Sequence, residues 1–206
     1  MLTIWGRITS INVRKAVWTA QELGLEFERI DAGGAFGVTK TPEYIAMNPN
    51  SVVPTLVEGD FTLWESNVIV RYLCAKHSLG NLYPSDLQAR FNAERWMDWQ
   101  QTTFSPSGRD AFWQLIRVPE AERDMKKVEA SIAGTEILLD RFEAHLSTTE
   151  YVAGKTLTMA DIPMACEIHR WFGLNLPSKS RPHIEAWYAK MLARPGSKNV
   201  FTLPLA

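Results

Sequence analysis

The chain has 206 residues and a formal net charge of −1, with 46% hydrophobic and 22% charged residues. This composition is ordinary for a globular protein, and the near-zero charge gives no electrostatic reason to expect a nucleic acid or an anionic membrane as a partner. No apolar run approaches the length of a membrane span. From the charge and the apolar runs together, we expect neither a membrane nor a nucleic acid partner.

The first part of the chain predicts a β-α-β unit. Residues 2–5 are a short strand candidate, and a loop with turn chemistry follows over residues 6–12. Helical spacing of apolar residues predicts a helix over residues 13–23, and alternation predicts a second strand over residues 26–30. The glycine-rich stretch 31–37 matches neither a phosphate loop nor a dinucleotide fingerprint. Strand, helix and strand in this order form a parallel crossover.

A short helix and a hairpin come next. Thr41 is a typical helix cap and Pro42 a typical first helical residue. Two short apolar runs then flank Gly59, which is the pattern of a tight β-hairpin, and Pro54 heads the first run where no ladder donor is needed. With the following helix, the order β-α-β-α-β-β-α is that of a thioredoxin-like domain.

A helix is predicted to begin at Glu65 or Ser66 and to reach about His77. The N-terminus of a helix has unpaired N–H groups and a partial positive charge, which together bind anions. An acidic side chain beside it can hold an ammonium group, so a ligand with a carboxylate and an amine on one carbon would fit. In the alternative interpretation, Ser66 only caps its helix and Glu65 is solvated.

The second half is predicted to be helical. A linker over residues 79–86 precedes it, Ser105-Pro106-Ser107-Gly108 is expected to kink or break it, and Thr158-Met159-Ala160-Asp161 has the pattern of a capping box. The predicted helices cover residues 87–104, 109–116, 120–146, 158–171 and 181–192.

The cysteines and the N-terminal segment indicate the compartment. Cys74 and Cys166 are far apart and neither belongs to a Cys-x-x-Cys, which fits free thiols in a reducing environment. The segment from Met1 to Arg7 lacks the basic start and apolar core of a signal peptide. The four histidines show no metal-ligand spacing. We expect a cytoplasmic protein without a metal.

Taken together, these motifs resemble the glutathione S-transferases. Val-Pro-Thr-Leu at residues 53–56, the hairpin, and Glu-Ser-Asn at 65–67 resemble the glutathione-binding half, and Leu157–Ile162 resembles the capping box of the helical half. The resemblance covers essentially the whole chain and looks most like a bacterial-type branch near the beta and theta classes. It implies an α/β plus all-α fold, with a thioredoxin-like domain over 1–78 and an all-helical domain over 87–206.

The resemblance also implies how glutathione is held. The proline that corresponds to Pro54 is cis in the family, and the backbone at the position of Val53 pairs with the cysteinyl part of glutathione. The residues that correspond to Glu65 and Ser66 hold the γ-glutamyl end, and Asn67 is expected to support that site.

The resemblance gives less specific expectations for two further residues. A basic residue near Lys40 meets the glycyl carboxylate of glutathione in the family, although a solvated surface lysine is the alternative. An acidic residue near Asp98 reaches the glutathione amine of a partner subunit in many relatives, so the resemblance also implies a homodimer.

Glutathione chemistry needs a thiolate, and a free thiol has a pKa of about 8.5. The loop before the first helix carries Thr9, Ser10 and Asn12, where the family places its catalytic hydroxyl or thiol. Ser10 is the first choice as donor to the sulfur, Thr9 and Asn12 remain open, and all three residues can instead only cap the helix. No tyrosine precedes Tyr44 and no cysteine lies in the loop, which argues against tyrosine-type and cysteine-type enzymes.

The second substrate is expected between the two domains. Aromatic residues at helical spacing are more often core than pocket, and Arg109 either steers an anionic or polarised electrophile or pairs with a nearby acid. The candidates are Phe104, Arg109, Phe112, Trp113, Trp171 and Phe172.

The leading hypothesis for function is a glutathione transferase in which the thiolate attacks a small apolar electrophile. A glutathione-dependent disulfide or peroxide reductase is the second hypothesis, because the same site can do this chemistry with two bound glutathiones. A non-catalytic module that binds glutathione or another ligand is the third.

Overall fold

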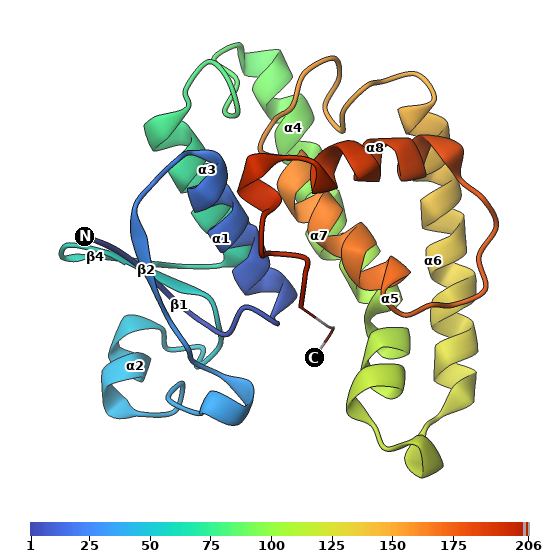
Figure 1. Cartoon of the computed structure of the whole chain (residues 1–206), viewed down its shortest axis with the longest axis horizontal. Helices are drawn as coiled ribbons and strands as arrows, with labels where there is room; N and C mark the ends of the chain where they lie inside the picture. Colours follow the sequence, from blue (N-terminus) through green and yellow to red (C-terminus); the bar gives the residue numbers. More distant parts are fainter. Residues whose placement is uncertain (204, 206) are drawn as a thin grey trace.

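The computed structural model describes residues 1–203 and 205. Its first half is a four-stranded sheet in the order β2-β1-β3-β4, in which β1 is parallel to β2 and antiparallel to β3 (Figure 1). This topology confirms the predicted crossover unit and hairpin. The strands are β1 (Leu2–Trp5), β2 (Phe27–Ile30), β3 (Thr55–Glu58) and β4 (Phe61–Trp64).

Three helices accompany the sheet: α1 (Ile11–Glu22), α2 (Pro42–Met47) and α3 (Ser66–His77). The hydroxyl of Thr41 accepts a hydrogen bond from the N–H of Tyr44, so the predicted cap of α2 is present. The expected loop over residues 6–12 was too long, because Ser10 has the extended backbone of an N-cap and α1 begins directly after it. Asn12 therefore lies in the first turn of α1.

The second half is a helical domain (Figure 1). A short 3-10 turn occurs in the first half at Gly34–Phe36, and others occur in the second half at Glu120–Glu122 and Pro195–Ser197. The longer elements of this half are α4 (Leu87–Trp99), a π-helical turn (Gln100–Phe104), α5 (Ser105–Phe112), a second π-helical turn (Trp113–Arg117), α6 (Met125–Leu146), α7 (Asp161–Phe172) and α8 (Pro182–Leu192).

Residues 105–108 do not break the helix, which was one of the two expected outcomes there, because the backbone stays helical from Leu87 to Arg117. Pro106 has no N–H and its ring disturbs the preceding turn of an α-helix. Here the preceding turn is π-helical, and the N–H of Ser105 bonds to the carbonyl of Gln100. The wider turn accommodates the proline without ending the helix.

The long helix α6 also begins later than expected. Residues 120–122 form only a 3-10 turn, and α6 starts after Asp124, whose carboxylate accepts hydrogen bonds from the N–H groups of Lys126 and Lys127. The cap of Asp124 therefore decides the start of the helix, and the apolar spacing upstream of it does not.

Helix α7 lies in the core of the helical half, and its first residue fixes its start. The buried carboxylate of Asp161 accepts from the N–H groups of Val152 and Thr158, both at 2.9 Å, and from Nε1 of Trp187 at 3.0 Å. The Thr158 hydroxyl accepts from the N–H of Ala160 at 3.3 Å. The predicted pair of Thr158 and Asp161 is therefore joined by hydrogen bonds, but the helix begins at Asp161 with Ala160 as its N-cap, three residues later than expected. The Asp161 carboxylate also holds the preceding loop and α8.

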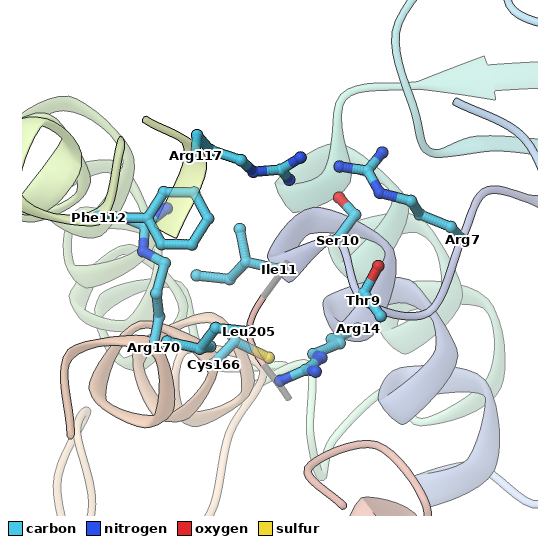
Figure 2. A pocket seen from close by; sticks show the side chains of 10 residues that line it. All are labelled: Arg7, Thr9, Ser10, Ile11, Arg14, Phe112, Arg117, Cys166, Arg170 and Leu205. Atoms are coloured by element: carbon cyan, nitrogen blue, oxygen red, sulfur yellow. The ribbon is translucent and has the colours of Figure 1, made fainter. Parts of the chain in front are cut away.

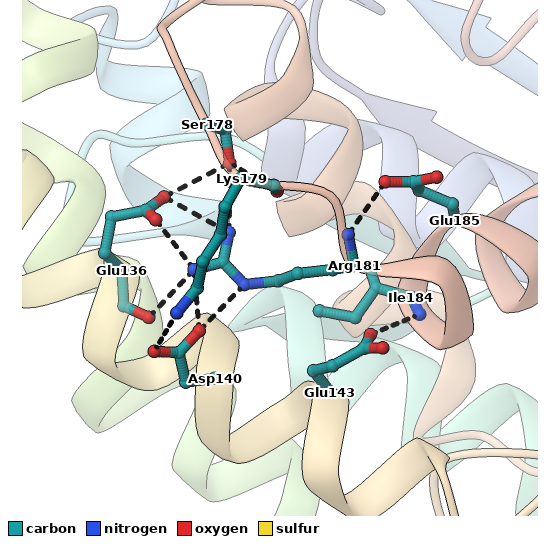
Figure 3. A network of polar contacts seen from close by, with 8 residues as sticks. All are labelled: Glu136, Asp140, Glu143, Ser178, Lys179, Arg181, Ile184 and Glu185. Atoms are coloured by element: carbon teal, nitrogen blue, oxygen red, sulfur yellow. Dashed lines mark hydrogen bonds and ion pairs between the residues drawn. The ribbon is translucent and has the colours of Figure 1, made fainter.

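A buried arginine attaches the segment before α8 to α6 (Figure 3). Arg181 is 3% exposed and donates to Glu136 at 2.7 Å and to Asp140 at 2.8 Å. Glu143, one turn further along α6, accepts from the N–H of Ile184 at 2.9 Å and so caps α8. Because these contacts join residues about 40 positions apart, they fix where α8 lies on the bundle.

The two halves meet at α1, which packs against both α3 and α7. The N-terminus of α1 therefore lies at the interface between the sheet domain and the helical domain. Cys74 and Cys166 are buried free thiols. Within the described residues, no helix is both long and apolar enough to cross a membrane.

Candidate functional site

The segment before β3 and the start of α3 form one side of the site. The Val53–Pro54 peptide bond is cis, as the resemblance implied. Glu65 has a φ of 71° at the N-cap of α3, and its exposed carboxylate accepts from Nε2 of Gln101 at 3.4 Å. The unpaired N–H groups of the first turn of α3 lie beside this carboxylate. An anion and a cation can thus be held next to each other at the end of one helix.

Ser66 connects α3 to α1. Its buried hydroxyl donates to Oδ1 of Asn12 at 3.3 Å and accepts from Nζ of Lys15 at 3.5 Å. Asn12, one of the three candidates for contact with the thiol, is exposed and bonds to Ser66 instead of lining the cavity described below. The structure therefore associates Asn12 with the start of α3.

A chain of buried polar groups continues from Lys15 into the helical half. The Lys15 ammonium donates to Oε1 of Gln100 at 3.2 Å, and Nε2 of Gln100 donates to Glu167 at 2.7 Å. Glu167 also pairs with Arg170 one turn further along α7. Complete burial lowers the pKa of Lys15 to about 8, while the nearby Glu167 acts in the opposite direction. Asn67 joins this group by donating to Gln100 at 3.2 Å.

A cavity of about 110 Å³ lies at the N-terminus of α1, between the two halves. Thr9 and Ser10 both line it (Figure 2). Within the described structure, the Ser10 side chain makes no capping bond to its own helix. Its hydroxyl points into the space between the guanidinium groups of Arg7 and Arg117 (Figure 2). The hydroxyl and the first N–H groups of α1 are therefore available to an anion.

Four arginines line this cavity: Arg7, Arg14, Arg117 and Arg170. Arg14 is buried and donates to the carbonyl groups of Ile8 at 3.0 Å and Leu203 at 2.8 Å. Arg170 pairs with Glu167. Burial lowers the pKa of Arg7, and the charge of Arg117 lowers it further. The positive charge stabilises negative charge next to Ser10.

The rest of the cavity wall is apolar and includes Ile11, Phe112, Cys166 and Leu205. The Arg170 guanidinium lies 5.2 Å from the centre of the Phe112 ring. Burial raises the pKa of the Cys166 thiol to about 12, so this cysteine stays protonated and is not a nucleophile near neutral pH.

The structure separates the predicted substrate residues into three groups. Of these residues, Phe112 lines the cavity. Arg109 and Trp113 are exposed and line a different hollow, which lies outside the cavity at Ser10. Phe104 and Trp171 are buried in the core, where Phe104 stacks on Trp99. Trp171 packs over Gly108, and Phe172 packs edge-on against Tyr188.

Two other predicted residues lie on the surface. Lys40 is exposed in the segment before α2 and is not part of the cavity lining. The side chain of Asp98 is 67% exposed and pairs with Arg71 of its own chain.

The sequence-based reasoning missed Arg7, Arg117 and the chain from Lys15 to Arg170. One signal was present in the sequence: Glu167 and Arg170 stand one turn apart in a mostly apolar helix, which predicts a buried ion pair. Arg117 had no such signal, because only the packing of the second π-helical turn brings it to Ser10. Among the described residues, no group of three or more His, Cys, Asp and Glu side chains is arranged to hold a metal ion.

Both halves of the chain match known family models. Residues 1–75 match the model described as glutathione S-transferase, N-terminal domain, and residues 102–195 match glutathione S-transferase, C-terminal domain. The sequence is 37% identical to glutathione S-transferase GstB of Escherichia coli strain K12 over 100% of both chains. It is 32% identical to glutathione S-transferase 3 of Zea mays over 99% of this chain and 95% of the relative.

A solved structure is also similar over the full length. The crystal structure of the theta class glutathione S-transferase from the citrus canker pathogen Xanthomonas axonopodis pv. citri, with glutathione bound, has a TM-score of 0.95 to this chain. The sequences are 44% identical, and the match covers 100% of this chain and 99% of that chain.

Proposed function

The chain belongs to the glutathione S-transferase family and is a glutathione S-transferase, and on this premise we propose that Ser10 activates the glutathione thiol. In this proposal glutathione lies across the segment before β3, with its γ-glutamyl end at α3 and its sulfur at the N-terminus of α1. The thiolate then attacks a small electrophile in the cavity between the two halves.

The γ-glutamyl end is assigned to Glu65 and Ser66. The N–H groups at the start of α3 bind its carboxylate, and the Ser66 O–H turns from Asn12 to the same carboxylate when glutathione binds. The exposed Glu65 carboxylate binds the ammonium group. The contact of Ser66 with Asn12 supports this assignment, because it ties the γ-glutamyl site to the first turn of α1. We also propose the backbone of Val53 as the partner of the cysteinyl residue, held by the neighbouring Pro54.

The thiol is assigned to the Ser10 hydroxyl, with Thr9 as the second candidate. Lowering a thiol pKa by about two units requires roughly 2.7 kcal/mol of preferential stabilisation of the thiolate. A hydroxyl donor, the N–H groups of α1 and the adjacent arginines together can supply this amount. The uncommitted Ser10 hydroxyl in the cavity is the observation that carries the proposal.

Calorimetric titration of the protein with glutathione, combined with ultraviolet detection of the thiolate across pH, tests the proposal. We expect binding together with a pKa of the bound thiol well below its free value. Binding with an unshifted pKa would favour a carrier or a reductase over conjugation. No binding would show that the glutathione site is not functional in this chain.

We also propose a homodimer in a reducing, cytoplasmic environment. Large apolar side chains are exposed on β4 and α3 (Phe61, Trp64, Val68) and on α4 (Leu87, Phe91), and a second copy of the chain would cover them. Sedimentation velocity checks this. We expect a dimer for the wild-type protein and a shift toward monomer for Phe91→Asp.

A further inference from the structure

We infer that the pair Arg7 and Arg117 binds the carboxylate of an anionic second substrate, so that the electrophile of this enzyme is a small carboxylic acid. This inference rests on the proposed function, and it replaces the expectation of an apolar electrophile. Three observations carry it: the charge around the cavity, the missing partners of two of its arginines, and the way in which the glycine-rich stretch holds Arg7.

The charge around the cavity has one sign. Its lining includes four arginines, and no carboxylate lines it among the residues that the structure describes. Arg14 and Arg170 are engaged by protein groups, which are the carbonyl groups of Ile8 and Leu203 for Arg14 and the carboxylate of Glu167 for Arg170. These two arginines therefore have structural partners.

Arg7 and Arg117 lack such partners. In the described part of the chain, neither guanidinium donates to an acceptor or pairs with an acid, although Arg117 lies 5.7 Å from the centre of the Phe112 ring. The two groups face each other above the Ser10 hydroxyl (Figure 2). Arg7 is partly buried and Arg117 is exposed, and their like charges repel each other. A carboxylate between them removes this repulsion and accepts charge-assisted hydrogen bonds from both.

The glycine-rich stretch gives Arg7 its position. Gly33 and Gly34 have φ angles of 77° and 59°, and the Arg7 side chain lies directly over them. A Cβ atom added to Gly34 would lie 3.1 Å from Nε of Arg7, so a larger residue there would require the guanidinium group to shift. The loop that matched no nucleotide motif thus forms a close support for this guanidinium.

The position of the pair determines what it can bind. The pair stands on the Ser10 side of the site, and an apolar surface that includes Phe112 and Ile11 completes the cavity. A molecule with one carboxylate and a short reactive carbon chain would place its carboxylate on the arginines and its carbon beside the thiolate. The glycyl carboxylate of glutathione has the same chemistry, so the test must separate these two sources.

Iodoacetate and iodoacetamide form a matched pair of probes. They share the reacting CH₂–I group, and iodoacetate carries a carboxylate where iodoacetamide carries a neutral amide. In both reactions the glutathione sulfur forms a bond to the CH₂ carbon, the C–I bond breaks, and iodide leaves with the electron pair after the thiol proton has gone to solvent. Cys74 and Cys166 are buried, and burial raises the pKa of each thiol to about 12, so neither competes for the reagents.

The measured quantity is the ratio of kcat/KM for iodoacetate to that for iodoacetamide, divided by the same ratio for the uncatalysed reaction. We expect a value well above one for the wild-type enzyme and a fall of roughly tenfold in Arg7→Met and in Arg117→Met, since a charge-assisted contact is lost. Arg109→Met is the matched control, because this arginine is exposed on the outer side of the same helical run and should leave the ratio unchanged.

Binding of glutathione and of its glycyl ethyl ester separates the two carboxylate sources. Under the inference, Arg117→Met changes both affinities equally and slightly. Weaker binding of glutathione alone, with the ester unaffected, would assign the pair to the glycyl carboxylate and overturn the inference. Equal turnover of both reagents by the wild-type enzyme would overturn it while leaving the proposed function intact, whereas failure to conjugate either reagent counts against the proposed function itself.

Discussion

The ammonium group of Lys15 lies 3.5 Å from the Ser66 hydroxyl, so a buried cation on α1 contacts the residue that opens α3. The same ammonium group donates to Gln100, which in turn donates to Glu167 on α7. One completely buried polar chain therefore runs from the assigned γ-glutamyl site into the helical half. Because an unpaired member would be costly in this environment, the chain fixes the relative positions of α1, α3 and α7.

Lys15→Met should change how stability depends on pH. Burial lowers the pKa of Lys15 to about 8 in the folded state, against 10.5 as its ordinary value. Between these values the unfolded chain binds more protons, so the contribution of Lys15 to the free energy of unfolding rises with pH across this window. We expect urea unfolding to show that the free energy of unfolding of the wild-type protein, relative to that of Lys15→Met, rises by on the order of 2 kcal/mol between about pH 8 and about pH 10.

The groups that act on the Lys15 ammonium come from three elements and from the residue before α3. They are Ser66 on α3, Glu65 before it, Gln100 on the first π-helical turn, and Cys166, Glu167 and Arg170 on α7. Lys155→Met removes an exposed lysine and controls for the loss of a positive charge. A difference between the wild-type protein and Lys15→Met that stays constant with pH would contradict the assignment of a desolvated ammonium.

Ser10→Ala should raise the pKa of the bound glutathione thiol and lower kcat by roughly a hundredfold, while glutathione affinity changes little. The reason is that, in the proposed arrangement, the hydroxyl contacts the sulfur and not the peptide groups of the ligand. Thiolate absorbance across pH and steady-state kinetics measure the two effects. If Thr9→Val produces them and Ser10→Ala does not, the role of donor passes to Thr9.

Ser66→Ala should weaken glutathione binding by roughly tenfold, because it removes a donor to the γ-glutamyl carboxylate and the acceptor of the Lys15 ammonium. Calorimetric titration measures the change. Ser147→Ala, which alters an exposed serine at the end of α6, is the matched control. Unchanged affinity in Ser66→Ala would remove the assignment of the γ-glutamyl end to α3.

Asp161→Ala should destabilise the protein by several kcal/mol, since it leaves the buried N–H groups of Val152, Thr158 and Trp187 without an acceptor. Thermal unfolding of the full chain measures this loss. Asp161→Asn keeps one acceptor oxygen and should lie between the wild-type protein and Asp161→Ala. The exposed Asp110→Ala should have no comparable effect, and equal melting temperatures for all four proteins would contradict the role of Asp161.

The elements that the sequence predicted well are those with a local chemical cause. Gly59 permits the turn between β3 and β4, Thr41 and Pro42 begin α2, and Thr158 with Asp161 begins α7. Each of these signals acts over a few residues, so the chain alone contains the information. The local motifs, read in their order along the chain, were also sufficient for the resemblance to the family.

The sequence by itself therefore determined the fold and the family, and it placed the start of α3 at Glu65 or Ser66, whereas it placed the start of α1 two residues too late. Only the tertiary structure decided that Arg117 faces Ser10 while Arg109 does not, and that Phe104 and Trp171 are core residues. The surroundings of these residues come from segments far apart in the chain. Burial, charge pairing and the π-helical turns determine which way each side chain points. Such choices depend on packing between helices, which helical spacing alone does not specify.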